Sequence, residues 1–194
     1  MAVAGKHGIS EKTPEHIQFG AGTIHKNLKY TEGTGWNFAD SIIGATNGGS
    51  NFSVIPSIAP LELDGALVKF KDGEVKNGEE AKMELNMAEL TPELIKFSTF
   101  AQETESADKE YTLLESKPHI EKGDYLDNIA FVGKTLKGKN IIVIMDNALC
   151  TSGYNHEAKN KEGAIGKYTF ECHGDINGDL DTLPWHIYYP KASA

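Results

Sequence analysis

The chain has 194 residues, 39% hydrophobic and 24% charged, a balance typical of one globular domain. Its net charge is −9, and all 19 basic residues are lysines. Arginine supplies the planar fork that binds phosphate or guanine, and an acidic surface repels a nucleic-acid backbone, so the composition argues against nucleotide binding and sequence-specific DNA binding. The sequence contains no long apolar run and no signal-peptide pattern. We therefore expect the protein to be made and kept in the cytosol, or in an assembly formed there.

The N-terminal quarter combines an arm, a strand and a loop. Residues 1–15 are small or charged and lack periodicity, which predicts a flexible N-terminal arm. Residues 16–28 predict a first strand that Gly20 and Gly22 interrupt. Residues 30–50 contain five glycines and are interpreted as a loop.

This loop carries four large apolar residues that a solvated loop normally avoids: Trp36, Phe38, Ile42 and Ile43. Either the loop folds back on its own domain, or its apolar residues contact a partner. We interpret the four residues as candidates for a subunit interface. Because loops rarely carry the core, we expect their truncation to leave the monomer folded. If the loop packs on its own domain instead, the truncated protein should melt at a lower temperature.

The next segment predicts a strand, a series of turns and a second strand. Residues 52–63 are extended, with a bend expected near Pro60. Turn signals follow at Asp64-Gly65, Lys71-Asp72-Gly73 and Lys76-Asn77-Gly78. Residues 81–88 alternate apolar and polar side chains, which predicts a half-exposed strand.

One helix is predicted, at about residues 92–102. Thr91 can cap it and Pro92 suits the first helical position. The apolar residues within it recur at helical spacing, so one face is expected to pack on a sheet. The charged run 102–110 is interpreted as an exposed connector.

The second half of the chain predicts further short strands. They cover residues 111–115, 129–132, 141–145, 164–173 and 185–189, with turns at Lys137-Gly138 and Asn177-Gly178. Many short strands and a single helix indicate a mainly β protein, a β-sandwich or barrel with one packed helix. We expect one domain over residues 16–190 and a short C-terminal tail at 191–194.

No motif predicts catalysis or a cofactor. Residues 44–50 have the spacing of a phosphate loop, but glycine stands where the essential lysine would be. The seven histidines show no metal-ligand spacing, and no nucleophile elbow is present. Cys150 and Cys172 are interpreted as buried free thiols. We therefore expect no enzyme, no cofactor and no metal.

The acidic run 175–181 deserves a separate interpretation. Asp175, Asn177, Asp179 and Asp181 could supply oxygen ligands to Ca²⁺, but the glycine and the twelfth residue do not fit an EF-hand loop. Aspartate, asparagine and glycine are also the residues that turns prefer. We interpret the run as a turn between two strands, with no bound ion.

Several blocks of sequence resemble the tail tube proteins, or major tail proteins, of long-tailed phages and prophages of Gram-positive bacteria. The blocks are IIGATNGGSNFSVIPSIAPLELDGALVKF (42–70), AKMELNMAELTPELIKF (81–97), DYLDNIAFVGKT (124–135), NIIVIMDNALCTSG (140–153) and GDLDTLPWHIYYP (178–190). Together they cover most of the chain from about residue 16. Their order, more than any single block, carries the resemblance.

The resemblance implies a virion structural protein: a β-sandwich subunit forming hexameric rings that stack into a tube, through which genomic DNA passes without specific binding. It also implies a tape-measure protein, tail assembly chaperones, and terminator and baseplate proteins as partners. The acidic, arginine-free composition suits such a channel. The alternatives are the tube of a contractile tail or tail-like bacteriocin, a tail terminator, a small β-sandwich binding module and, weakest, a hydrolase.

Overall fold

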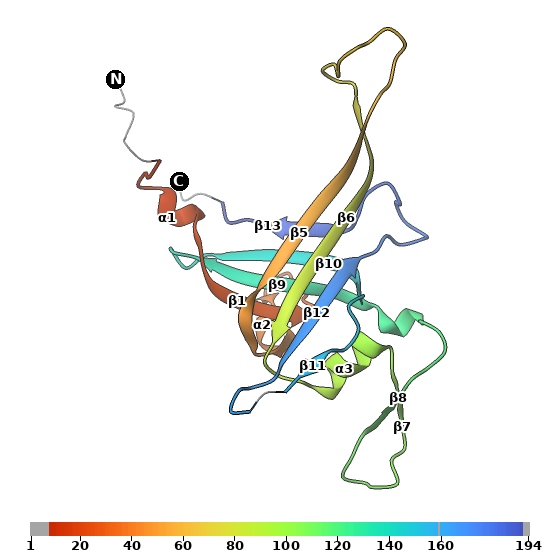
Figure 1. Cartoon of the computed structure of the whole chain (residues 1–194). Coiled ribbons are helices and arrows are strands. Elements are labelled where there is room, and N and C mark those ends of the chain that lie inside the picture. The colour runs from red at the N-terminus through yellow and green to blue at the C-terminus, as the bar shows by residue number, and fades with distance from the viewer. Residues whose placement is uncertain (1–7, 159, 192–194) are drawn as a thin grey trace.

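The computed structural model describes residues 8–158 and 160–191, and it is mainly β (Figure 1). Nine strands form one antiparallel sheet: β1 (Gln18–Lys26), β4 (Ile42–Gly44), β5 (Thr46–Pro60), β6 (Glu74–Met87), β9 (Leu126–Thr135), β10 (Asn140–Cys150), β11 (His156–Glu157), β12 (Ile165–Cys172) and β13 (Trp185–Tyr188). Two small hairpins accompany it: β2 (Tyr30–Thr31) with β3 (Gly35–Trp36), and β7 (Gln102–Thr104) with β8 (Leu113–Glu115). The helices are α1 (Thr13–His16), α2 (Phe38–Ser41), α3 (Pro92–Thr99) and the 3₁₀ turn η1 (Lys122–Asp124).

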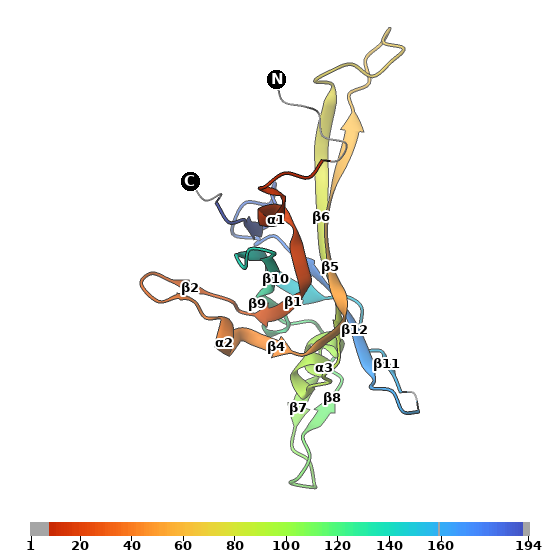
Figure 2. The ribbon, with the colours of Figure 1, turned by 90° about the vertical axis from the view of Figure 1, so that its left-hand side faces the viewer.

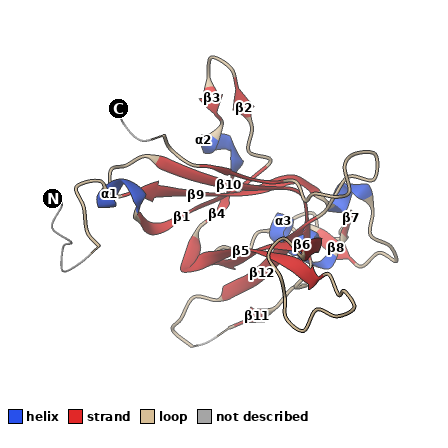
Figure 3. Ribbon diagram, turned by 90° about the horizontal axis from the view of Figure 1, so that it is seen from above, coloured by secondary structure: helices blue, strands red, loops and turns tan. Residues whose placement is uncertain are grey.

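The sheet folds into two layers because β10 has more than one neighbour on the same side. The strand order runs β4-β1-β9-β10-β12-β6-β5, and β13 also pairs with β10. Residues Ile142–Met145 of β10 pair with β13, whereas Ala148–Cys150 pair with β12. The strand thus leaves one layer and joins the other, and Figure 3 shows β1, β9 and β10 lying over β5, β6 and β12.

The main core lies between these layers. In β6, Ala81, Met83, Leu85 and Met87 are buried while the intervening residues are more exposed, as the alternating sequence predicts. β10 is different, since Ile141–Met145 are all buried. One face of β10 joins the main core and the other joins a second cluster, formed with Leu28, Ala130 and Val132.

The predicted interruption of β1 is confirmed at Gly22. Its φ is +69°, and the pairing register with β9 shifts between Phe19 and Thr23. A Cβ atom at this position would lie 2.5 Å from the ring of Phe131. Only glycine combines the left-handed backbone with such a close approach, so this residue lets β1 bend around the core.

The predicted helix is confirmed as α3, but it is shorter than expected. The hydroxyl of Thr91 accepts a hydrogen bond from the backbone N–H of Leu94 at 3.2 Å, as a capping residue should. The helix ends at Thr99 because Phe100 adopts a left-handed conformation with φ +54°. None of the helices in the described residues is long and apolar enough to cross a membrane.

Three local predictions were wrong. Residues 30–50 are not one loop: they contain the β2–β3 hairpin, α2, β4 and the start of β5. The connector 102–110 begins with β7. The expected turn at 76–78 lies inside β6, where the register shift opposite Ser57 and Ile58 accommodates it as a bulge.

The ends of the chain are described only in part. Residues 1–7 of the predicted arm and 192–194 of the predicted tail lie outside the described residues. Within the arm, Thr13–Glu15 belong to α1. His16 joins this helix to the C-terminal segment, since its Nδ1 lies 3.0 Å from the hydroxyl of Tyr189.

Candidate functional site

The four interface candidates do not form one exposed patch. Trp36 and Phe38 are half-buried and pack on the outer face of β9 and β10, against the second cluster. The Trp36 ring makes edge contacts with Tyr188 at 5.0 Å and with Tyr30 at 5.4 Å between centroids. Much of this aromatic surface is therefore already covered within the protomer.

The two isoleucines have opposite environments. Ile43 is 7% exposed and belongs to the main core, whereas Ile42 is 48% exposed. For Ile43 the structure favours the alternative, in which the segment packs on its own domain and truncation lowers the melting temperature, because this side chain fills space between the layers. Of the four candidates, Ile42 keeps the largest exposed surface, and its role in an interface stays a prediction.

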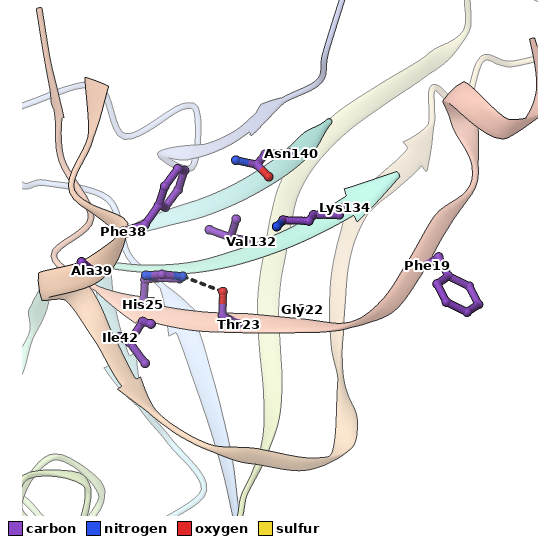
Figure 4. Close-up of a pocket in the computed structure, with 10 residues that line it drawn as sticks. All are labelled: Phe19, Gly22, Thr23, His25, Phe38, Ala39, Ile42, Val132, Lys134 and Asn140. Atoms are coloured by element: carbon purple, nitrogen blue, oxygen red, sulfur yellow. Dashed lines mark hydrogen bonds between the residues drawn. The ribbon is translucent and has the colours of Figure 1, made fainter. Parts of the chain in front are cut away.

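Ile42 borders a groove of about 560 Å³ between α2 and the outer face of β1 and β9, which we call the α2 groove (Figure 4). Its lining is Phe19, Gly22, Thr23, His25, Phe38, Ala39, Ile42, Val132, Lys134 and Asn140. The wall is largely apolar, with the amine of Lys134 and the amide of Asn140 at one end (Figure 4). This size and composition are typical of a site for a small ligand or a few side chains.

His25 forms a hydrogen-bonded chain beside this groove. Its Nε2 lies 2.7 Å from the hydroxyl of Thr23, and its Nδ1 lies 2.8 Å from that of Ser41. The Ser41 hydroxyl donates to the carbonyl oxygen of Asn37 at 2.9 Å. It can then accept from Nδ1–H, which leaves Nε2 to accept from Thr23. Burial lowers the pKa of His25, so the neutral ring is favoured.

A serine beside a histidine invites comparison with a hydrolase, but this pair lacks the required geometry. Ser41 is 2% exposed, and its proton is already directed at a backbone carbonyl. A nucleophile needs a hydroxyl that a substrate can reach and whose proton the histidine can accept. The series of hydrogen bonds from Thr23 through His25 and Ser41 to Asn37 instead attaches α2 to β1, and it shapes one wall of the groove.

The acidic run 175–181 forms the predicted turn. The backbone N–H of Gly178 donates to the carbonyl of Asp175 at 2.9 Å, and the N–H of Asn177 donates to the Asp175 carboxylate at 3.0 Å. The N–H of Asp181, and then the hydroxyl of Thr182, donate to Asp179 and lower its pKa. These carboxylates bind their own backbone, and no group of three metal-ligating side chains converges among the described residues.

A second surface, which the sequence did not identify, lies at the end of the β5–β6 hairpin. The hairpin extends well beyond the two layers (Figure 2). Every residue from 61 to 70 is exposed, including Leu67 at 99% and Val68 at 78%. We call residues 61–73 the hairpin tip. In the sequence this surface corresponds to apolar residues between the turn signals at Asp64-Gly65 and Lys71-Asp72-Gly73. Nothing in the sequence showed that these residues lie away from the core.

The outer edge of β5 is a third exposed feature. β5 ends the strand order and pairs with β6 alone within the described residues. Its 15 residues contain no charged side chain, although 24% of the whole chain is charged. Near its start it shares a small cavity with Gln18 of β1, so the freely accessible edge runs from about Ser53 toward the hairpin tip.

No protein-family model matches this sequence, and no curated protein matches it significantly. The likeness to tail tube proteins therefore depends on the sequence blocks alone.

Proposed function

We propose that the protein is a structural subunit of a phage tail tube, assembling into hexameric rings that stack around a channel for DNA. The observation that carries this proposal is the long, uncharged edge of β5. An exposed edge strand offers unpaired backbone groups to another chain, and monomeric proteins usually protect such edges with charges, bulges or covering segments. Within the described residues the β5 edge carries no charge, and its interruptions are Pro56 in the middle, Pro60 at the end and the register shifts at 46–50 and 57–58.

Pairing through this edge would bury apolar surface as well as backbone groups. Ile55 and Ile58 are 59% and 56% exposed on β5. Burial of such side chains stabilises an interface by about 25 cal/mol for each Å² of apolar area. A strand added to the edge of β5 thus suits lateral contact between neighbouring subunits of a ring.

The charge suits a channel that DNA crosses without binding. The chain has a net charge of −9 and no arginine, and the two lysines of β6, Lys76 and Lys82, form ion pairs with nearby carboxylates. Lys82, for example, contacts both Glu80 and Glu171. Lysines that already pair with carboxylates add little to the affinity of a protein for a phosphate backbone.

The rival of a small binding module is less well supported. Such a module is expected to present exposed tryptophans on one face, but Trp36 packs on its own sheet. Trp185 packs against the main core, and its indole donates to Glu79 at 3.1 Å. The tube of a contractile tail or tail-like bacteriocin remains the alternative within the same structural class.

The test is self-assembly followed by electron microscopy and sedimentation. We expect concentrated wild-type protein to form rings or tubes with a central hole. Ile55→Lys should prevent this, because a charge on an edge strand opposes pairing. The new lysine would lie opposite Glu80, the residue of β6 that pairs with Ile55, so the monomer should stay folded.

Ile55→Thr is the matched control, since it keeps a β-branched, uncharged side chain and should still assemble. A wild-type protein that remains monomeric at high concentration would refute the proposal. Equal assembly of the lysine and threonine variants would remove the β5 edge from the contact.

A further inference from the structure

We propose that the α2 groove binds a small amphipathic anion, a linear alkyl carboxylate, with its carboxylate at Lys134 and Asn140 and its alkyl chain along the apolar wall. This binding site goes beyond the proposed function and does not depend on it, because a single subunit contains the whole groove. The groove has a volume of about 560 Å³, which is within the usual range for small-ligand sites.

The apolar part of the groove is an open continuation of the second cluster. Val132 belongs to that cluster, and Phe38 packs against it. Ile42 also lines the groove and is 48% exposed, so its surface is available to a ligand. Figure 4 shows Val132 between Phe38 and the side chain of Lys134. An alkyl chain in this space would remove apolar surface from water, which favours binding.

The polar end consists of two side chains that can reach the same anion. Lys134 of β9 pairs directly with Asn140 of β10, so the two side chains are cross-strand neighbours on one face of the sheet. Neither side chain has a hydrogen-bond or ion-pair partner among the residues that the structure describes. An ammonium group and an amide NH₂ offer donors to the two oxygens of one carboxylate.

The charges around the groove favour a monoanion. Its described lining contains Lys134 but no aspartate or glutamate, although the chain has 28 acidic residues. His25 is held by the hydroxyls of Thr23 and Ser41, and burial lowers its pKa, so that end of the groove is neutral. A phosphate monoester carries about −1.5 to −2 at pH 7 and would need more cationic groups than this lining offers. The single lysine therefore matches a carboxylate and fixes its orientation.

The test is isothermal titration calorimetry of dilute protein with hexanoate, octanoate and decanoate, each below its critical micelle concentration. We expect one site per subunit. The affinity should rise about two- to fourfold for each added methylene, because each one leaves water for the groove. Decylammonium has the chain of decanoate but the opposite charge, and it should bind at least about tenfold more weakly than decanoate.

Two variants and one control locate the ligand. Lys134→Met keeps an unbranched side chain without the charge, and its affinity for decanoate should fall about five- to tenfold. Lys137→Met is the matched control, since Lys137 lies outside the lining in the β9–β10 turn, and it should bind decanoate as the wild type does. Ala39→Trp fills the groove with a large ring and should abolish saturable binding. Ala39 is exposed, so this variant should stay folded, which a circular dichroism melt checks.

No saturable binding of decanoate by the wild type up to about 1 mM would overturn the proposal. Equal affinities for decanoate and decylammonium, or equal affinities of the two methionine variants for decanoate, would refute the carboxylate position at Lys134. Binding that persisted in folded Ala39→Trp would place the ligand outside the α2 groove and would also overturn the proposal. None of these outcomes bears on assembly, which electron microscopy of the wild-type protein decides separately.

Discussion

Ile42 and Ile43 are adjacent isoleucines that allow a direct comparison of surface and core. Ile43→Ala removes three carbons from a side chain that is 7% exposed within the main core. At about 0.8 kcal/mol per buried carbon, the transfer loss is roughly 2.4 kcal/mol. The cavity left behind adds to this, so we expect a total loss of about 3 kcal/mol. Ile42→Ala removes the same atoms at 48% exposure, and we expect a loss of about 1 kcal/mol.

Thermal and urea unfolding of dilute protein, where assembly does not contribute, would measure this difference. For a chain of this length, a loss of about 3 kcal/mol corresponds to a melting temperature lower by roughly 6–12 °C. Ile42→Ala should lower it by only about 2–4 °C. Equal losses in the two variants would contradict the placement of Ile43 between the layers. Such a result would instead support the interpretation of residues 36–43 as an exposed loop.

Two further predictions concern β1. Burial lowers the pKa of His25, so as the pH falls below about 6.5 the unfolded chain takes up a proton before the folded protein does, and stability is lost. The urea midpoint of His25→Gln should therefore fall less than that of the wild type between about pH 7.5 and 5.5. An unchanged pH dependence in the variant would contradict the lowered pKa. Gly22→Ala should lower the stability of the protein more than Gly20→Ala does. Both residues have positive φ, but only at Gly22 would the new methyl group collide with a neighbour. Equal urea midpoints for the two variants would contradict the packing of β1 on β9.

The sequence predicted most strands and the helix because those segments carry local signals. The alternation in β6, and the threonine and proline before α3, depend on a few neighbouring residues and on short-range backbone preferences. The continuous apolar run 141–145 was also informative. It fits a strand that is covered on both faces, and in the structure the main core covers one face of β10 and the second cluster lies on the other.

The fate of residues 36–43 could not be read from the sequence, because it depends on which distant surface remains uncovered. The outer face of β9 and β10 is apolar, and Trp36 and Phe38 provide its cover. This pairing joins segments about a hundred residues apart, and no local pattern encodes it. The α2 groove was missed for the same reason, since Phe38, Val132 and Asn140 come from three separate elements.

The exposed surfaces pose a thermodynamic problem that assembly would resolve. A monomer with a long uncharged edge strand, and with Ile55 and Ile58 exposed on that strand, presents surface that favours association with another chain. A tube requires two kinds of contact, one within a ring and one between rings, and a subunit needs a separate surface for each. In the proposed assembly the β5 edge would supply the contact within a ring. This assignment predicts a defect at the first stage of assembly, because Ile55→Lys should abolish rings as well as tubes.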